Sequence, residues 1–168
     1  MGKKQTHDRK SNALTPFFVS LTFILLSHMG TRSRIGLQVN GGIVSVYHHW
    51  DGYPEWLGRV LVEHFPTEEK VRELIDGGDM SCCWSDSDWQ LEKIEERPLY
   101  YSERGEECPP KMSETLTEYL DLAENTDGEY AYLFDGEWTC FEIGQYNDGV
   151  KGRILDIPPK EEVPVTTS

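Results

Sequence analysis

The 168-residue chain lacks the short motifs that mark the common classes of enzyme. It contains no phosphate-binding G-x-x-x-x-G-K-[ST], no dinucleotide-binding G-x-G-x-x-G, no nucleophile-elbow G-x-S-x-G and no zinc-binding H-E-x-x-H. Its 30 acidic residues include neighbours such as Glu95 and Glu96, but such pairs are more typical of a solvated face than of a catalytic site. The sequence therefore indicates no enzyme class, no catalytic residue and no cofactor.

Cysteine is scarce as well. The four cysteines, Cys82, Cys83, Cys108 and Cys140, show no C-x-x-C spacing and are too few for a disulfide scaffold. The direct neighbours Cys82 and Cys83 are also difficult to bridge to each other. We therefore predict reduced thiols in a cytoplasmic protein.

Histidine gives little support for a metal site or a catalytic base. His48 and His49 are adjacent in a predicted strand, so their side chains point to opposite faces and cannot readily share a metal ion. We expect no metal site. A hydrolase or transferase with one of these histidines as its base is the weakest of three functional hypotheses.

Basic residues are few, with 16 Lys and Arg against 30 Asp and Glu and a formal net charge of −14. A surface of this charge repels phosphate backbones, which argues against general nucleic-acid binding. Residues 65–168 alone carry 9 basic and 26 acidic residues, a net charge of −17. Such a surface favours rapid association with a basic partner.

The chain has no apolar run of the ~20 residues that a membrane-spanning helix needs, since its longest covers only residues 13–26. Residues 1–28 pair this run with a basic start, as a secretory signal does, but no small-residue cleavage site follows. We predict an N-terminal extension over 1–28, one acidic domain over 29–146 and a flexible tail over 147–168. Export, membrane anchoring or a core helix are the alternatives for residues 1–28.

Two β-hairpins are predicted. Residues 34–39 and 43–48 flank Asn40-Gly41-Gly42, and their alternation places Ile35 and Leu37 on one face. The second hairpin joins residues 129–134 to 137–143 through a two-residue turn, Asp135-Gly136. The register of that turn sets Ala131 opposite Cys140 and Leu133 opposite Trp138, with Tyr130 opposite Phe141 and Tyr132 opposite Thr139.

Three short helices are predicted between these hairpins. The first follows Pro54 and carries Leu57, Val60, Leu61 and His64 on one face. Thr67 caps a second helix that ends at Gly77-Gly78, and Ser113 caps a third. Residues 79–112 predict one or two short strands within long loops. The fold class is thus α+β, with an antiparallel sheet built from two β-hairpins and two or three short helices packed on one face.

The most unusual local feature is the aromatic turn that runs from Trp50 to Trp56. Aromatic faces beside guanidinium groups can stack on and clamp a nucleobase or a phosphate, although core aromatics are the commoner explanation. The candidate ligand-binding residues are Trp50, Asp51, Tyr53, Trp56, Arg34, His49 and Arg59.

Five segments together resemble an uncharacterised family of small bacteriophage proteins. They are residues 29–36 (MGTRSRIG), 48–59 (HHWDGYPEWLGR), 70–76 together with 78–79, 101–106 and 130–140. The resemblance implies an infected bacterial cytoplasm as the setting and assigns no catalytic residue.

These observations favour a non-catalytic binding protein that acts on a host or phage protein in the host cytoplasm. The alternative is a nucleotide or small-anion binding module centred on the aromatic turn. Membrane association is expected only if residues 1–28 serve as an anchor.

Overall fold

A computed structural model describes residues 30–84, 96–144 and 151–159, and these form an α+β fold as predicted. The strands are β1 (Ser33–Val39), β2 (Gly42–His48), β3 (Met80–Cys83), β4 (Pro98–Tyr100), β5 (Lys111–Ser113), β6 (Tyr130–Phe134), β7 (Trp138–Glu142) and β8 (Ile154–Leu155). The helices are α2 (Arg59–His64), α3 (Glu68–Asp76) and α4 (Leu116–Asn125), with a π-helical turn η1 (Pro54–Gly58) before α2 and a 3-10 turn η2 (Tyr101–Arg104) after β4.

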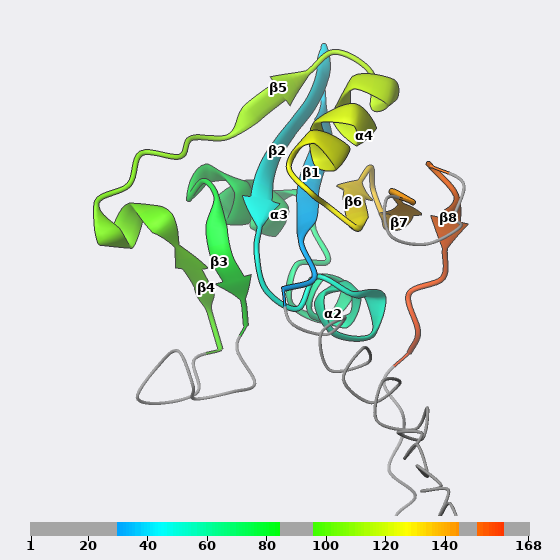
Figure 1. Ribbon diagram of the computed structural model, residues 1–168. Coiled ribbons are helices and arrows are strands. Elements are labelled where there is room, and N and C mark those ends of the chain that lie inside the picture. The colour runs from blue at the N-terminus through cyan, green and yellow to red at the C-terminus, as the bar shows by residue number, and fades with distance from the viewer. Residues whose placement is uncertain (1–29, 85–95, 145–150, 160–168) are drawn as a thin grey trace, which may run out of the picture.

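The first predicted hairpin is confirmed and forms the centre of the sheet (Figure 1). β1 pairs antiparallel with β2, with Ile35 opposite Val46 and Leu37 opposite Val44. Gly41 and Gly42 have φ values of 88° and 151°, which suit glycine because it has no Cβ. Local turn chemistry therefore determines this register.

The sheet is mixed, so the predicted antiparallel sheet built from two hairpins is matched only in part. Its strands lie in the order β4-β3-β2-β1-β6-β7-β8, and β5 pairs with the first part of β2. β6 runs parallel to β1, because α4 carries the chain back along the sheet before β6 begins (Figure 1). The two hairpins therefore meet through a parallel pair.

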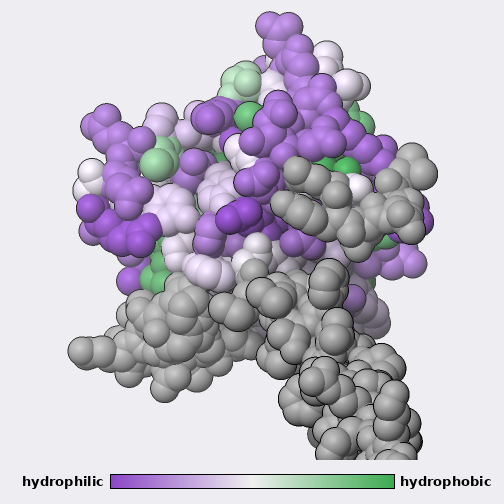
Figure 2. All heavy atoms as spheres, in the orientation of Figure 1, coloured by the Kyte–Doolittle hydropathy of each residue, from purple (hydrophilic) through white to green (hydrophobic). Residues whose placement is uncertain are grey.

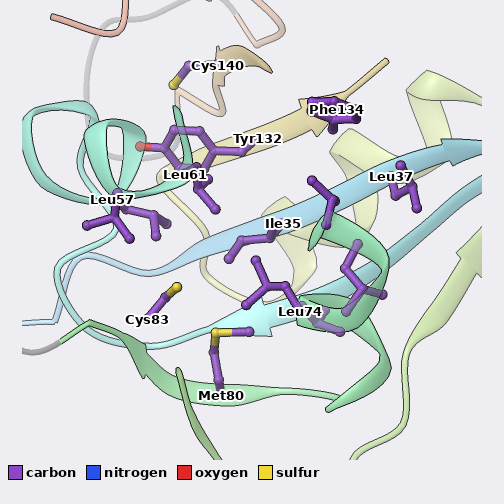
Figure 3. Packing of buried hydrophobic residues seen from close by; sticks show 14 residues of the cluster. Ile35, Leu37, Leu57, Leu61, Leu74, Met80, Cys83, Tyr132, Phe134 and Cys140 are labelled. Atoms are coloured by element: carbon purple, nitrogen blue, oxygen red, sulfur yellow. The ribbon is translucent and has the colours of Figure 1, made fainter. Parts of the chain in front are cut away.

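The helices lie on both faces of the sheet, not on one as predicted. α2 and α3 pack on the face that carries Ile35 and Leu37, and Figure 3 shows Leu57, Leu61 and Leu74 of this cluster. α4 packs on the opposite face through Tyr119, Leu120 and Ala123. The second layer is possible because Gly36 has no side chain, and a Cβ there would lie 2.9 Å from the Tyr119 ring.

The helix caps were predicted in part. The Thr67 hydroxyl accepts a hydrogen bond from the backbone N–H of Lys70 at the start of α3, as predicted. Ser113 was expected to cap α4, but it belongs to β5 and pairs with Ile43. The cap of α4 is Thr115, whose hydroxyl accepts from the N–H of Glu118.

The second hairpin exists, but its predicted register is wrong by one residue. The turn includes Glu137, whose carbonyl accepts a hydrogen bond from the N–H of Asp135. Phe134 therefore pairs with Trp138, and Tyr132 pairs with Cys140 instead of Thr139. Likewise Tyr130 pairs with Glu142, Ala131 with Phe141 and Leu133 with Thr139. A one-residue change in turn length shifts every cross-strand pair.

Ile154 and Leu155, which lie in the region that we expected to be a flexible tail, join the sheet as β8. β8 pairs with β7, and Leu155 and Ile157 pack against the cluster beneath α2 and α3. Residues 1–28 and most of the remaining predicted tail lie outside the described residues. Within the described ranges, no helix is long and apolar enough to cross a membrane.

Candidate functional site

The aromatic turn is tied to the fold by backbone contacts. Asp51 has a positive φ of 59°, and the N–H of Gly52 donates to the carbonyl of Thr31 at 2.8 Å. A Cβ at Gly52 would lie 2.6 Å from the Ser33 hydroxyl, so the chain passes too close to β1 for any side chain. The conformation of the turn is therefore set by its fit against the start of β1.

Two of the candidate ligand-binding residues hold distant backbone segments in place. Trp56 donates from Nε1 to the carbonyl of Trp84 at 3.2 Å, and its ring packs on the α2 and α3 side of the core. Arg59 donates from Nε to the carbonyl of Pro158 at 3.2 Å. These contacts give both side chains a structural role at the corner of the domain.

The sheet separates the candidate residues into two groups. Arg59 belongs to α2, and α2 packs on the face of Ile35. Arg34 is the neighbour of Ile35 in β1, so its side chain points to the α4 face. The structure does not bring Arg34 and Arg59 together, whereas Trp50 and His49 touch edge to face with ring centroids 4.5 Å apart. Tyr53 is half-buried at the end of the turn.

His48 is fully buried and ties three strands together. Its Nε2 accepts from the N–H of Cys83 at 3.0 Å, so the proton must lie on Nδ1, which donates to the Ser33 hydroxyl at 3.1 Å. Burial lowers the pKa of His48 to about 3. The ring is therefore neutral, with both nitrogens engaged, and serves as a structural group.

A hollow of about 310 Å³, the cationic cleft, opens on the α4 face of the sheet. Figure 2 shows this side of the molecule, where hydrophilic side chains dominate. The cleft is lined by residues from β1, β2, the start of β3, the start of β5 and the turn after α4. They include Arg32, Arg34, Tyr47, Asp79, Lys111 and Asp127.

Arg34 lies deepest in the cationic cleft, with 1% of its surface exposed. Its Nε donates to the Ser45 hydroxyl at 2.8 Å and its Nη2 to the Ser45 carbonyl at 3.4 Å. Burial lowers the pKa of the Arg34 guanidinium from its usual value, while the nearby Tyr119 and Asp79 act in the opposite direction. Arginine keeps its charge in proteins, so the fold holds a cation at the bottom of this hollow.

The two carboxylates of the cleft already have partners. Asp79 accepts a hydrogen bond at Oδ1 from the N–H of Tyr47 at 2.8 Å, and Asp127 lies 3.5 Å from the guanidinium of Arg32. Burial raises the pKa of Asp79, opposed by the Tyr47 hydrogen bond and by the charges of Arg34 and Lys111. These contacts fix the carboxylates beside the cations without neutralising Arg34 directly.

An aromatic edge borders the cationic cleft. The Tyr47 hydroxyl and His49 Nδ1 are 2.6 Å apart, and the His49 ring continues this edge to Trp50. Burial lowers the pKa of His49, and the positive charges of Arg32 and Arg104 lower it further. A histidine with a lowered pKa is a weak base at neutral pH.

A second hollow, the acidic groove, has a volume of about 480 Å³ and lies at the C-terminal end of α3. Its lining includes Asp76, Gly77, Gly78, Glu106, Glu107 and Cys108. The sequence analysis missed this groove, although the Gly77-Gly78 pair and the neighbouring Glu106 and Glu107 were its signals. The two hollows are adjacent along the chain, because Gly78 lines the acidic groove and the next residue, Asp79, lines the cationic cleft.

The four cysteines are free thiols, as predicted. Cys82, Cys83 and Cys140 are buried, and burial raises the pKa of the Cys140 thiol to about 12. Burial also raises the pKa of Cys83. Thiols with raised pKa values are poor nucleophiles, so Cys83 and Cys140 serve as packing groups.

Within residues 30–84, 96–144 and 151–159, no group of three or more His, Cys, Asp or Glu side chains could hold a metal ion. Comparison of the chain with protein-family models, curated proteins and solved structures gives no match.

Proposed function

We propose that this chain is a non-catalytic binding protein that engages a basic surface of a host or phage protein through its acidic groove. The setting is the infected bacterial cytoplasm that the resemblance to phage proteins implies. The observation that carries the proposal is a hollow lined by carboxylates in a chain of net charge −14.

The groove favours a cationic occupant for two reasons. Asp76 and Glu107 take part in none of the ion pairs among the described residues, so their charges are available to a partner. The carbonyl end of α3 also points toward this hollow at Asp76 and Gly77, and a helix C-terminus carries a partial negative charge. The two carboxylates and the partial negative charge of the helix end both attract lysine or arginine side chains.

The walls of the groove suit recognition without rearrangement. Gly77 lies against the ring of Tyr100, whose hydroxyl donates to the carbonyl of Leu74 at 2.9 Å. The N–H of Asp79 donates to the carbonyl of Cys108 at 2.9 Å, which joins the two sides of the groove. A preformed site loses less entropy when its partner binds.

The test is capture of partners from a bacterial lysate with the full chain, at stepwise increasing salt. The groove variant Asp76→Asn/Glu107→Gln removes two charges, and the matched control Asp135→Asn/Glu137→Gln removes two exposed charges from the β6–β7 turn. We expect the same protein to be recovered by the wild type and the control, and to be lost with the groove variant and at raised salt. Equal recovery by both variants, or recovery that salt does not change, would contradict the proposal.

The second candidate function, binding of a nucleotide or small anion, is favoured by a different observation. The cations that converge are Arg32, Arg34 and Lys111 in the cationic cleft, not the residues of the aromatic turn. A rise in melting temperature with a nucleotide or another anion would support this alternative, since a ligand at 100 times its Kd adds ~2.7 kcal/mol of stability.

A further inference from the structure

Arg34 is a buried cation that forms no ion pair with a carboxylate of the described residues. Its side chain is almost fully buried, yet no carboxylate among the described residues forms an ion pair with it. Among the described residues, its hydrogen bonds go to the hydroxyl and carbonyl of Ser45, and the guanidinium has further N–H donors beyond these two. Charged groups that are removed from water are normally paired, so this arrangement calls for an anion.

The surroundings of Arg34 provide space and charge for such an anion. The cationic cleft has a volume of about 310 Å³, which is within the lower range of small-molecule sites. Arg32, Arg34 and Lys111 supply three positive charges, and Asp79 and Asp127 supply two negative ones. The local excess is one positive charge in an otherwise acidic protein.

We propose that the cationic cleft binds a small carboxylate ligand, with Arg34 as its bidentate anchor and Lys111 as the second cation. A planar carboxylate matches the guanidinium fork, and its single charge matches the local excess. A phosphate brings a second negative charge, which Asp79 and Asp127 oppose at close range. This site lies on the opposite side of Gly78 and Asp79 from the acidic groove, and the inference does not depend on the proposed function.

The inference can be tested by NMR titration of the full chain. The probes are sodium propionate, inorganic phosphate and AMP, each against sodium chloride of equal ionic strength, and the reporter is the Nε–H signal of Arg34. We expect a saturable shift with propionate and a Kd on the order of 1 mM. Because a doubly charged anion meets the two cleft carboxylates, phosphate and AMP are expected to bind more weakly.

Two single-charge variants supply the matched comparison. Lys111→Gln removes an exposed cation of the cleft, and Lys70→Gln removes an exposed cation of α3 outside it. We expect Lys111→Gln to weaken propionate binding several-fold and Lys70→Gln to leave it unchanged. Arg34→Met, whose folding is checked by circular dichroism, is expected to abolish saturation.

Three outcomes would overturn the inference. They are the absence of a saturable Arg34 shift with propionate, tighter binding of phosphate or AMP than of propionate, and equal Kd values for Lys111→Gln and Lys70→Gln. The Lys variants keep the test decisive if Arg34→Met fails to fold, because neither lysine is buried.

Discussion

The two faces of the sheet differ in what they bury. The face beneath α2 and α3 holds a continuous apolar cluster (Figure 3). The buried polar pair on this face, His48 and Ser33, forms hydrogen bonds within the fold. The face beneath α4 holds a smaller apolar cluster beside a buried arginine and an open hollow. One face is therefore a closed apolar core, and the other combines an apolar cluster with an open, charged hollow.

The difference follows from how much of each face the helices cover. α4 has ten residues and is roughly 15 Å long, so one short helix must cover its face alone. It packs on β2 and β6, and the cationic cleft opens just beyond its C-terminal end, at Thr126 and Asp127. Incomplete covering of a sheet face leaves room for polar side chains near the surface.

The largest expected effect is the loss of a side chain from the apolar face. Leu74 of α3 is 1% exposed, and Leu74→Ala should lower the free energy of unfolding by ~2–5 kcal/mol through lost transfer energy and a residual cavity. Val62 of α2 is 48% exposed, and Val62→Ala should change it by less than ~0.5 kcal/mol. Urea denaturation measures both values. Equal values would mean that this face is not the stabilising core.

The buried histidine should make the stability of the apolar face depend on pH. The folded state holds His48 neutral with a pKa of about 3, whereas the unfolded chain protonates it near 6.5. The unfolded state therefore binds more protons between these values. The contribution of His48 is complete above pH 6.5 and falls by ~1.4 kcal/mol per pH unit as the pH decreases toward 3.

Comparison with a variant that lacks the imidazole separates the contribution of His48 to the pH dependence of stability from that of the other titrating groups. The unfolding free energy of the wild type and of His48→Asn is measured from pH 7 to about pH 4. We expect the difference between the two proteins to shrink as the pH falls. A difference that stays constant with pH would show that His48 is not held neutral by the fold.

On the α4 face, the close approach of Tyr119 to Gly36 provides the next test. A Cβ at Gly36 would lie 2.9 Å from the Tyr119 ring, so Gly36→Ala should cost ~1–3 kcal/mol by forcing the ring to move. The double variant Gly36→Ala/Tyr119→Leu should cost less than the sum of the two single variants, because the clash is removed. Additive costs, measured by urea denaturation, would show that the two residues do not interact.

Local sequence signals predicted the hairpins and helices well, because each depends on a few neighbouring residues. The turn at Gly41 and Gly42 and the cap at Thr67 are examples. The parallel pairing of β1 with β6 was not predictable in this way, since it joins Ser33 to Tyr130 across most of the domain. The register of the second hairpin failed because Glu137 extends the turn by one residue.

The candidate site shows the same limit. Strand alternation correctly places the side chains of Arg34 and Ile35 on opposite faces of the sheet. Lys111 and Asp127, which line the cleft with Arg34, are remote from it in sequence and could not be predicted in this way. Arg34 and Arg59 were expected at one site only because both are close to the aromatic turn in sequence. The structure separates them because they project from opposite faces of one sheet.

Removal of a helix cap is expected to change the free energy of unfolding least. It also tests whether the helices of the two faces differ in their own stability or only in how they pack on the sheet. Thr67 caps α3 and Thr115 caps α4, and both hydrogen bonds are exposed. Removing either hydroxyl by substitution with Ala should cost ~1 kcal/mol. The α4 cap should cost slightly more, because the carboxylate of Glu118 also accepts from the N–H of Glu114 at 2.8 Å.

Thr117→Ala, at an exposed position within α4, is the control and should change the unfolding free energy by less than ~0.5 kcal/mol. Thermal unfolding of the three variants measures these differences. Similar costs for the two caps, beside a large cost for Leu74→Ala, would place the contrast between the faces in their packing. If Thr67→Ala instead costs several times more than Thr115→Ala, the contrast lies in the helices themselves, because α3 then contributes stability before it packs against the sheet.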